Sequence, residues 1–417
     1  MRYALFSLLL ATTLAATPAP AETTITYQAW GSPAEGKVWA DIARAFEAGH
    51  PDIKVDIQLA DWDSYWEKLR VQIAGGTPPD VFAMSPPLYP DWQSRGVLLN
   101  LQPYLDADPT ALEGVYPVTL QAYQTPDGYF GLPRDFQTIV LYYNKDMFDA
   151  AALAYPTADW TWQDLRSAAK ALTLDKDGDG RTDQWGFTAD GYGPEALIAP
   201  MIRSYGGDLV DVAARKTLLG SPEALQALTL IREMFVTDRS MPNEQQVASF
   251  GWDPFLAGVA AMTLSGHWSI PDYSASPLHW DIAPIPQGPK GRVTTVNSAG
   301  FVISKDTKAP DAAFAFVKFA TSVEGQTLAA SIGLAVPIRA AVATSPAYLD
   351  QTSAAIDHAL FVQALDYARP LPVFRGYEEW GTALGDNLNL IWTDQMPLAD
   401  AVAEAVAAGD AAFARSN

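Results

Sequence analysis

The sequence predicts an α/β fold with more than one lobe, and three features support this. At the start of the chain, residues 24–29 and 55–59 alternate between polar and apolar side chains, as strands do. Residues 38–46 and 62–73 place apolar side chains at helical spacing, and residues 80–84 form a short apolar run typical of a buried strand. This strand–helix–strand–helix–strand order predicts a largely parallel sheet.

The second feature is the order of helix and strand signals in the remainder of the chain, and the third feature is the chain length. Helix signals dominate residues 136–280, strand patterns return at 280–285 and 299–303, and helices are expected at 308–321 and 397–413. Without residues 1–21 the chain has 396 residues, which is long for one compact core and natural for two lobes.

Residues 1–21 read as a secretory signal peptide. Arg2 is followed by an apolar stretch from Ala4 to Ala16, and Ala19-Pro20-Ala21 offers a small-x-small cleavage site. The apolar stretch is shorter than the roughly 20 residues of a membrane-spanning helix. The chain has no cysteine, so we expect neither disulfides nor a lipid anchor on cysteine. We expect a mature protein that starts near Glu22 and works in the periplasm.

The composition excludes some partners. The net charge is −21, and it becomes −22 when Arg2 is removed. Nucleic acids and anionic membrane surfaces are polyanions and would be repelled. We therefore expect a protein that binds no nucleic acid. Separately, we expect a monomer.

Six local motifs, in a fixed order over about residues 75–340, resemble one family. They are Gly75-Gly-Thr-Pro-Pro-Asp-Val-Phe82, Gly131-Leu-Pro133 with Leu141-Tyr-Tyr-Asn-Lys-Asp-Met-Phe148, Thr161-Trp-Gln-Asp-Leu165, Phe255-Leu-Ala-Gly-Val-Ala-Ala-Met262 with Gly266, Ser304-Lys305 through Phe319, and Gly333 to Arg339. Each is weak alone. Together they resemble the solute-binding proteins of ABC importers, in the carbohydrate class that includes maltose-binding protein.

This resemblance implies a periplasmic-binding-protein fold, with two α/β lobes of non-contiguous segments, a hinge and a ligand cleft between them. By analogy, lobe one holds residues 22–131 and 285–321, and lobe two holds 136–280 and 322–417. The chain would cross between them at Pro133–Gln137, around Ala283–Pro286 and near Thr321. The implied function is capture of a sugar or oligosaccharide outside the cytoplasm and its delivery to a membrane permease, without a required cofactor.

Candidate binding residues are polar or aromatic side chains in loops, because sugars pack on aromatic faces and hydrogen-bond to planar polar groups. Several follow predicted strands, where ligands of open α/β sheets gather, and others lie on expected crossings or in loops between late elements. Burial in the core or a turn competes with binding at each position. The candidates are Trp30, Asp61, Trp62, Ser85, Asp135, Gln137, Trp252, Gly266, His267, Trp268, Asn297, Ser298, Arg375 and Glu378.

Residues 175–183 resemble the first nine positions of a calcium-binding loop. Asp175, Asp177, Asp179 and Asp183 supply oxygens at positions 1, 3, 5 and 9. The twelfth position is Gly186 instead of a bidentate glutamate. The segment is thus either a structural calcium site or an Asp/Gly turn.

The sequence leaves two other functions open. The receptor could take a phosphorylated polyol such as glycerol 3-phosphate, with Arg375 or Arg339 as the counter-charge. A secreted glycoside hydrolase would need two carboxylates across the scissile bond. However, the sequence has neither Gly-x-Ser-x-Gly nor His-Glu-x-x-His, so we expect no enzyme.

Overall fold

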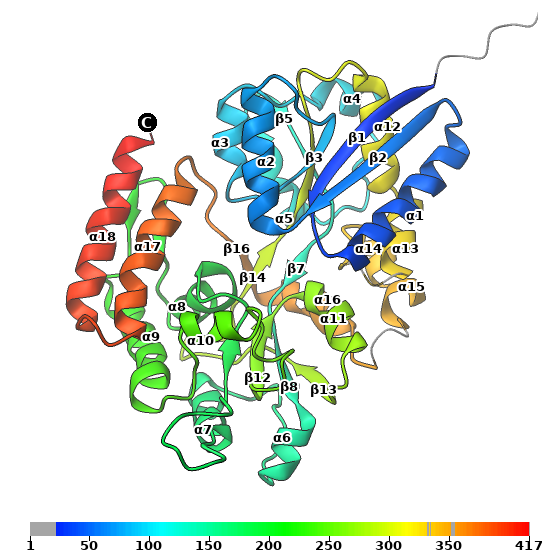
Figure 1. The fold of residues 1–417 in the computed structure, drawn as a ribbon. Coiled ribbons are helices and arrows are strands. Elements are labelled where there is room, and N and C mark those ends of the chain that lie inside the picture. The colour runs from blue at the N-terminus through cyan, green and yellow to red at the C-terminus, as the bar shows by residue number, and fades with distance from the viewer. Residues whose placement is uncertain (1–21, 332, 334, 352–354, 417) are drawn as a thin grey trace, which may run out of the picture.

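The computed structural model describes residues 22–331, 333, 335–351 and 355–416. The expected signal peptide, residues 1–21, lies outside this part. Figure 1 shows two lobes, one above the other, joined by strands and loops. Within the described residues, no helix is long and apolar enough to cross a membrane.

The first lobe contains a five-stranded sheet in the order β2-β1-β3-β15-β6. Strands β1 to β3 are parallel, while β15 runs antiparallel to both of its neighbours. The strands are β1 (Thr23–Trp30), β2 (Ile53–Ala60), β3 (Val81–Met84), β6 (Leu132–Pro133) and β15 (Gly300–Ile303). The helices are α1 (Pro33–Gly49), α2 (Trp62–Ala74), α3 (Tyr89–Ser94), α4 (Gln102–Ala107), α5 (Pro117–Leu120), α12 (Pro310–Ala320) and α13 (Val323–Ser331). The predicted opening pattern is confirmed.

The second lobe contains a four-stranded sheet in the order β13-β8-β12-β9. It is mixed, because β8 pairs antiparallel with both β12 and β13 while β12 pairs parallel with β9. The strands are β8 (Val140–Asn144), β9 (Thr188–Ala189), β12 (Met262–Ser265) and β13 (Trp280–Ala283). The helices are α6 (Lys145–Ala150), α7 (Trp162–Leu172), α8 (Ala199–Ser204), α9 (Pro222–Arg232), α10 (Glu244–Ser249), α11 (Ile270–Ala275), α17 (Tyr377–Trp392) and α18 (Leu398–Arg415).

A third, three-stranded sheet joins the lobes. Its order is β16 (Ala368–Pro370), β14 (Thr294–Asn297) and β7 (Gln137–Thr138). The chain runs from β6 through β7 to β8, and later from β14 to β15, so it passes between the lobes at residues 133–140 and 297–300. Among the described residues, three short α-helices lie between α13 and β16 in the chain. They are α14 (Ala340–Ala343), α15 (Pro346–Leu349) and α16 (Ala359–Gln363).

The structure places two of the expected crossings between the lobes at other positions in the chain. The second crossing lies after Asn297 and not at Ala283–Pro286, since Gln287 and Lys290 still hydrogen-bond with the backbone of Trp162 and Ser204 in the second lobe. Helix α13 packs against α1 and α12, so the chain stays with the first lobe beyond Thr321.

Each lobe has its own core. Buried side chains such as Tyr27, Phe46 and Phe301 fill the first lobe, and side chains such as Phe148, Trp162 and Trp380 fill the second. A smaller cluster with Phe136 and Val336 lies around the connecting segments. Separate cores let two lobes move relative to one another around a cleft.

Candidate ligand-binding cleft

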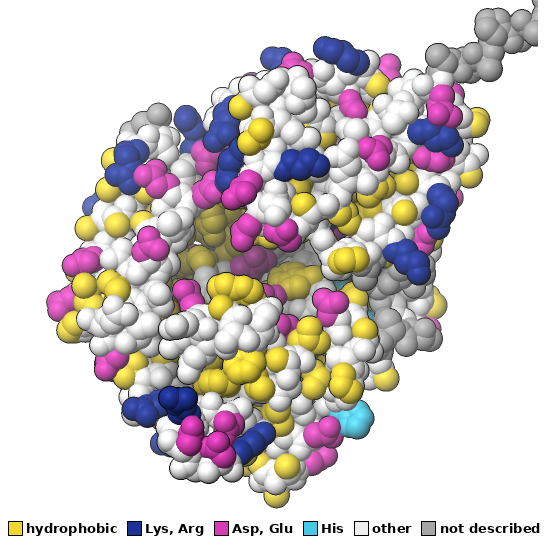
Figure 2. Space-filling view, viewed as in Figure 1, with side chains coloured by type: hydrophobic (Ala, Val, Ile, Leu, Met, Phe, Trp, Pro, Cys, Tyr) yellow, Lys and Arg dark blue, Asp and Glu magenta, His cyan; other side chains and the backbone are white. Residues whose placement is uncertain are grey.

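A cavity of about 640 Å³ lies between the two lobes. Figure 2 shows the hollow at this level of the molecule, with hydrophobic and acidic side chains gathered in it. The described residues that line it are Trp30, Glu35, Trp62, Ser85, Pro86, Arg134, Asp135, Gln137, Asp190, Gly191, Glu195, Trp268, Asn297 and Ala299.

Seven of the candidate residues from the sequence lie in this lining. They are Trp30, Trp62, Ser85, Asp135, Gln137, Trp268 and Asn297. Trp30 ends β1, Trp62 follows β2 and Ser85 follows β3. Because these strands are parallel, their carboxyl ends meet at one edge of the sheet, and that edge faces the cleft.

An aromatic cluster forms the first-lobe wall. The ring of Trp30 lies 4.9 Å from that of Trp62, edge to face, and is stacked on Trp66 at 5.7 Å. Trp66 and Tyr65 are buried, whereas Trp62 keeps 46% of its surface exposed. The buried rings therefore hold a tryptophan whose remaining surface is available to a ligand.

Helix caps fix two acidic side chains near this wall. Asp61 caps α2 by accepting a hydrogen bond from the backbone N–H of Ser64, at 3.0 Å, and it does not line the cleft. Glu35 belongs to a capping box with Ser32 at the start of α1 and does line the cleft. Burial raises the pKa of Glu35. Asp61 thus has a structural role as the cap of α2, outside the lining, and its expected contact with the ligand stays a prediction.

A buried ion pair lies at the first crossing. The Nε of Arg134 donates to Oδ2 of Asp135 at 2.7 Å, and both residues are 5% exposed. The guanidinium also lies 5.3 Å from the Trp30 ring and 5.2 Å from the Trp39 ring. Oδ1 of Asp135 is buried without a donor among the described residues. A buried acceptor without a donor costs free energy that a ligand hydroxyl could recover.

Trp268 forms part of the second-lobe wall, just after β12. Its Nε1 donates to Oδ2 of Asp190 at 2.5 Å, which fixes the orientation of the indole. Gly266 lies beneath the ring: a Cβ there would lie 2.2 Å from a ring carbon of Trp268. Gly266 therefore makes room for the tryptophan and does not line the cleft itself.

His267 points away from the cleft. It is fully buried, with its ring near Tyr348, His358 and Phe361. Burial lowers the pKa of His267 to about 3. Its backbone N–H donates to Oε1 of Gln137 at 3.1 Å, so His267 supports a cleft residue and does not line the cavity.

Glu195 and Asn297 form a polar pair at the end of β14. Nδ2 of Asn297 donates to Oε1 of Glu195 at 3.0 Å, while Oδ1 of Asn297 is buried without a partner among the described residues. Burial raises the pKa of Glu195 to about 7. Ser298 is buried instead and donates to the backbone oxygen of Asp135 at 2.6 Å.

Three further candidates lie outside the cleft lining. Trp252 is 67% exposed in a turn with a φ of 69°. Glu378 forms an ion pair with Arg70, and Arg375 directly precedes the left-handed Gly376 before α17. None of the three lines the cavity.

Sequence reasoning did not identify four of the lining charges. They are Glu35, Arg134, Asp190 and Glu195. Two had a usable signal: Glu35 follows Trp30 within a capping box, and Arg134 precedes Asp135 at the crossing. Asp190 follows a two-residue strand, and Glu195 lies in the first part of a π-helical turn. Neither element is long enough to produce a periodic pattern in the sequence.

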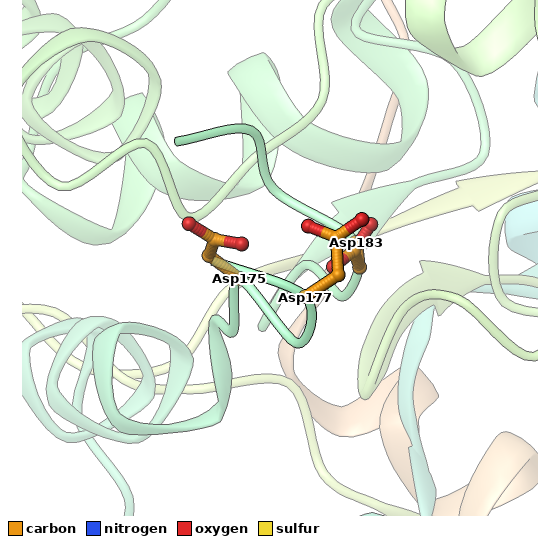
Figure 3. Close-up of side chains that lie close together, drawn as sticks. All are labelled: Asp175, Asp177 and Asp183. Carbon is orange, nitrogen blue, oxygen red and sulfur yellow. The ribbon is translucent and has the colours of Figure 1, made fainter. Parts of the chain in front are cut away.

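The acidic loop folds into a tight cluster outside the cleft. Figure 3 shows the side chains of Asp175, Asp177 and Asp183 gathered around this loop. One carboxylate oxygen from each lies within 4.8 Å of the others, and Asp179 is not part of this group. Backbone N–H groups of Gly178 and Gly180 already donate to Asp175. Gly186 packs closely against Ala169: a Cβ at position 186 would lie 1.8 Å from the backbone oxygen of Ala169. A glutamate therefore has no room at this position.

Comparison with known proteins gives the family. The profile of bacterial extracellular solute-binding proteins matches residues 30–327. A putative binding protein of Brucella abortus is 25% identical over 355 residues, which is 82% of each chain. A maltodextrin-binding protein of Bacillus subtilis is 25% identical over 286 residues, 65% of this chain and 63% of that one.

Solved structures agree with this match. An ABC substrate-binding protein of Listeria monocytogenes in complex with cycloalternan superposes with a TM-score of 0.85 at 25% identity, and covers 93% of this chain and 97% of its own. The two lobes, the cleft and the matched profile give one conclusion: the chain belongs to the family of bacterial extracellular solute-binding proteins.

Proposed function

We propose that this protein is the sugar receptor of an ABC importer. It captures a sugar or oligosaccharide between its lobes outside the cytoplasm and delivers it, as a monomer, to the membrane permease. The first lobe comprises residues 23–133 and 300–331, and the second lobe comprises residues 138–297 and 377–415. The two lobes close on the ligand.

One observation carries this proposal: partly exposed tryptophan surface lies beside buried acceptors without donors. Trp62 and Trp268 are on opposite lobes of the same cavity. Oδ1 of Asp135 and Oδ1 of Asn297 lack donors among the described residues. A sugar satisfies both, because its ring C–H faces pack on indoles and its hydroxyls donate hydrogen bonds.

The charges favour a sugar over a phosphorylated polyol. Arg375 is outside the lining, and Arg339 donates to backbone oxygens of Ala111, Glu113 and Thr321. Arg134 is already paired with Asp135. The phosphate group of such a ligand is an anion at neutral pH and would meet no free cation in the described lining.

The relatives support the same ligand class. The Listeria monocytogenes protein was solved with cycloalternan, and the Bacillus subtilis relative is a maltodextrin-binding protein. These relatives are binding proteins, and we propose that this chain likewise releases its ligand unchanged.

Calorimetry tests the ligand class. Mature protein is titrated with monosaccharides, α- and β-linked oligosaccharides and glycerol 3-phosphate, and bound ligand is recovered and analysed. Tight binding of a sugar that is recovered intact supports the proposal. Exclusive binding of glycerol 3-phosphate, or recovery of cleaved sugar, contradicts it.

We propose a periplasmic location without a lipid anchor. The signal-like start and the lack of cysteine support this, although one Streptomyces antibioticus relative is a lipoprotein. Mass spectrometry of the exported protein should give an unmodified N-terminus near Glu22. An added lipid mass, or material retained in the membrane fraction, would contradict the proposal.

We propose that the loop of Asp175, Asp177 and Asp183 binds calcium weakly and only stabilises its own segment. Three carboxylates are close enough to share one ion, but a bidentate ligand is lacking at Gly186. Millimolar calcium should raise the thermal midpoint of the wild type and not that of Asp175→Asn. Equal midpoints with calcium and with chelator would exclude the site.

A further inference from the structure

Two carboxylates on the second-lobe wall of the cleft lack a positive partner. Asp190 follows β9 and is exposed, and Glu195 starts the π-helical turn Pro194–Ile198. Both line the cavity, next to Trp268. Neither takes part in an ion pair with any described residue.

Each of these carboxylates has one oxygen occupied and one oxygen free. Oδ2 of Asp190 accepts from Oγ of Ser265 at 2.9 Å and from Nε1 of Trp268 at 2.5 Å. Oε1 of Glu195 accepts from Nδ2 of Asn297 at 3.0 Å. No described side chain or backbone group donates to Oδ1 of Asp190 or Oε2 of Glu195.

The charge of Asp190 acts on Glu195. Burial raises the pKa of Glu195 to about 7, the hydrogen bond from Asn297 opposes this, and the charge of Asp190 adds to the increase. Tyr377 also faces Glu195, and the nearby Arg203 is held by Asp208 at 2.9 Å. The pair therefore has a deficit of positive charge that its own surroundings do not compensate.

The opposite wall does not supply that charge either. The described lining contains four carboxylates, from Glu35, Asp135, Asp190 and Glu195, and one guanidinium, from Arg134. That guanidinium is bound to Asp135, which is 5% exposed and still has an unpaired Oδ1. With four carboxylates and one guanidinium that is already paired, the charged groups of the described lining carry a net negative charge.

We propose that the ligand is a sugar that carries a protonated amine, and that Asp190 and Glu195 bind this amine. This inference rests on the proposed sugar-receptor function. An ammonium donates three hydrogen bonds and compensates the negative charge, whereas a hydroxyl at the same position donates one and leaves the charge in place. Glu195 is then the residue that determines specificity.

The test compares ligands that differ at one group. Wild-type mature protein is titrated at pH 7 with glucosamine, glucose and N-acetylglucosamine, and with the β1,4-linked dimers of glucosamine, glucose and N-acetylglucosamine. The same titrations are made with Glu195→Gln, which keeps the shape and the hydrogen bond from Asn297, and with Glu404→Gln. Glu404 is exposed on α18, so this control makes the same change of charge far from the cleft.

The expected result is an amine form that binds at least tenfold more tightly than its hydroxyl and acetylated counterparts. Glu195→Gln should reduce this ratio to below threefold with little change for the hydroxyl form, and Glu404→Gln should leave the ratio unchanged. Equal or tighter binding of the hydroxyl or acetylated form overturns the amine inference and leaves the sugar receptor standing. Absence of binding by every sugar, beside binding of glycerol 3-phosphate, overturns both.

Discussion

The carboxylate of Asp91 caps a helix of the opposite lobe. Asp91 lies on α3 in the first lobe, and its two oxygens are 3.0 and 3.1 Å from the backbone nitrogen of Gly376, which directly precedes α17 of the second lobe. Beside it, Arg70 of α2 forms an ion pair with Glu378 on the first turn of α17. Since a helix N-terminus carries partial positive charge, these contacts stabilise the arrangement in which the lobes are together.

Removing this cap should weaken ligand binding. A helix cap contributes about 0.5–2 kcal/mol, so Asp91→Ala should raise Kd by about twofold to thirtyfold if the cap forms only when the lobes close. Arg70→Ala should have a smaller effect, because both partners of that ion pair are largely exposed. Calorimetry measures Kd, and Asp386→Ala on the exposed face of α17 is the control. An unchanged Kd in Asp91→Ala would show that the cap is equally present in the open protein.

The half-exposed Trp62 should contribute to binding more than to folding. Trp62→Ala removes an aromatic surface from the cleft and should raise Kd at least tenfold, about 1.4 kcal/mol, with a small change in thermal midpoint. Trp252→Ala is the matched control, because Trp252 is 67% exposed and outside the lining. If both variants bind like the wild type, the stacking role of Trp62 is wrong.

Gly266 should matter through the space it leaves for Trp268. In Gly266→Ala the new methyl would overlap the indole, so the ring must move and its bond to Asp190 must break. We expect at least a tenfold loss of affinity, similar to that of Trp268→Ala, and little added loss when the two changes are combined. Additive losses in the double variant would mean that Gly266 acts independently of Trp268.

Residues that follow long regular elements could be placed from the sequence. Trp30 and Trp62 lie at the ends of strands whose period of two is clear, and Ser85 follows the short apolar run of β3. Parallel pairing then brings the three residues to one edge. The capping box that positions Glu35 is also a local motif. The position of Glu35 at the start of α1 could therefore be predicted from the sequence, whereas its place in the cleft lining could not.

Residues that depend on contacts between distant segments could not be placed in this way. Glu195 meets Asn297, and Asp190 meets Trp268, across gaps that no local pattern records. Trp252 and Trp268 both follow glycine-containing loop sequences, yet one is exposed in a turn and the other is fixed at the cleft. Glu378 was expected at the ligand and instead meets Arg70, because the position of α17 against α2 follows from how the lobes pack.

The buried His267 should make folding sensitive to acid. Its folded-state pKa of about 3 lies below its ordinary value of 6.5, so as pH falls between these values only the unfolded chain takes up the proton. Above pH 6.5, His267 does not lower the free energy of unfolding. Below pH 6.5 it lowers that free energy progressively, by about 2 kcal/mol at pH 5. His267→Phe should remove this loss, since phenylalanine suits the contacts with Phe361 and Tyr348. Urea unfolding of both proteins at pH 7 and pH 5 measures the difference, and contributions from Glu35 and Glu195 cancel between them. A constant difference in unfolding free energy at the two pH values would contradict a neutral, buried His267.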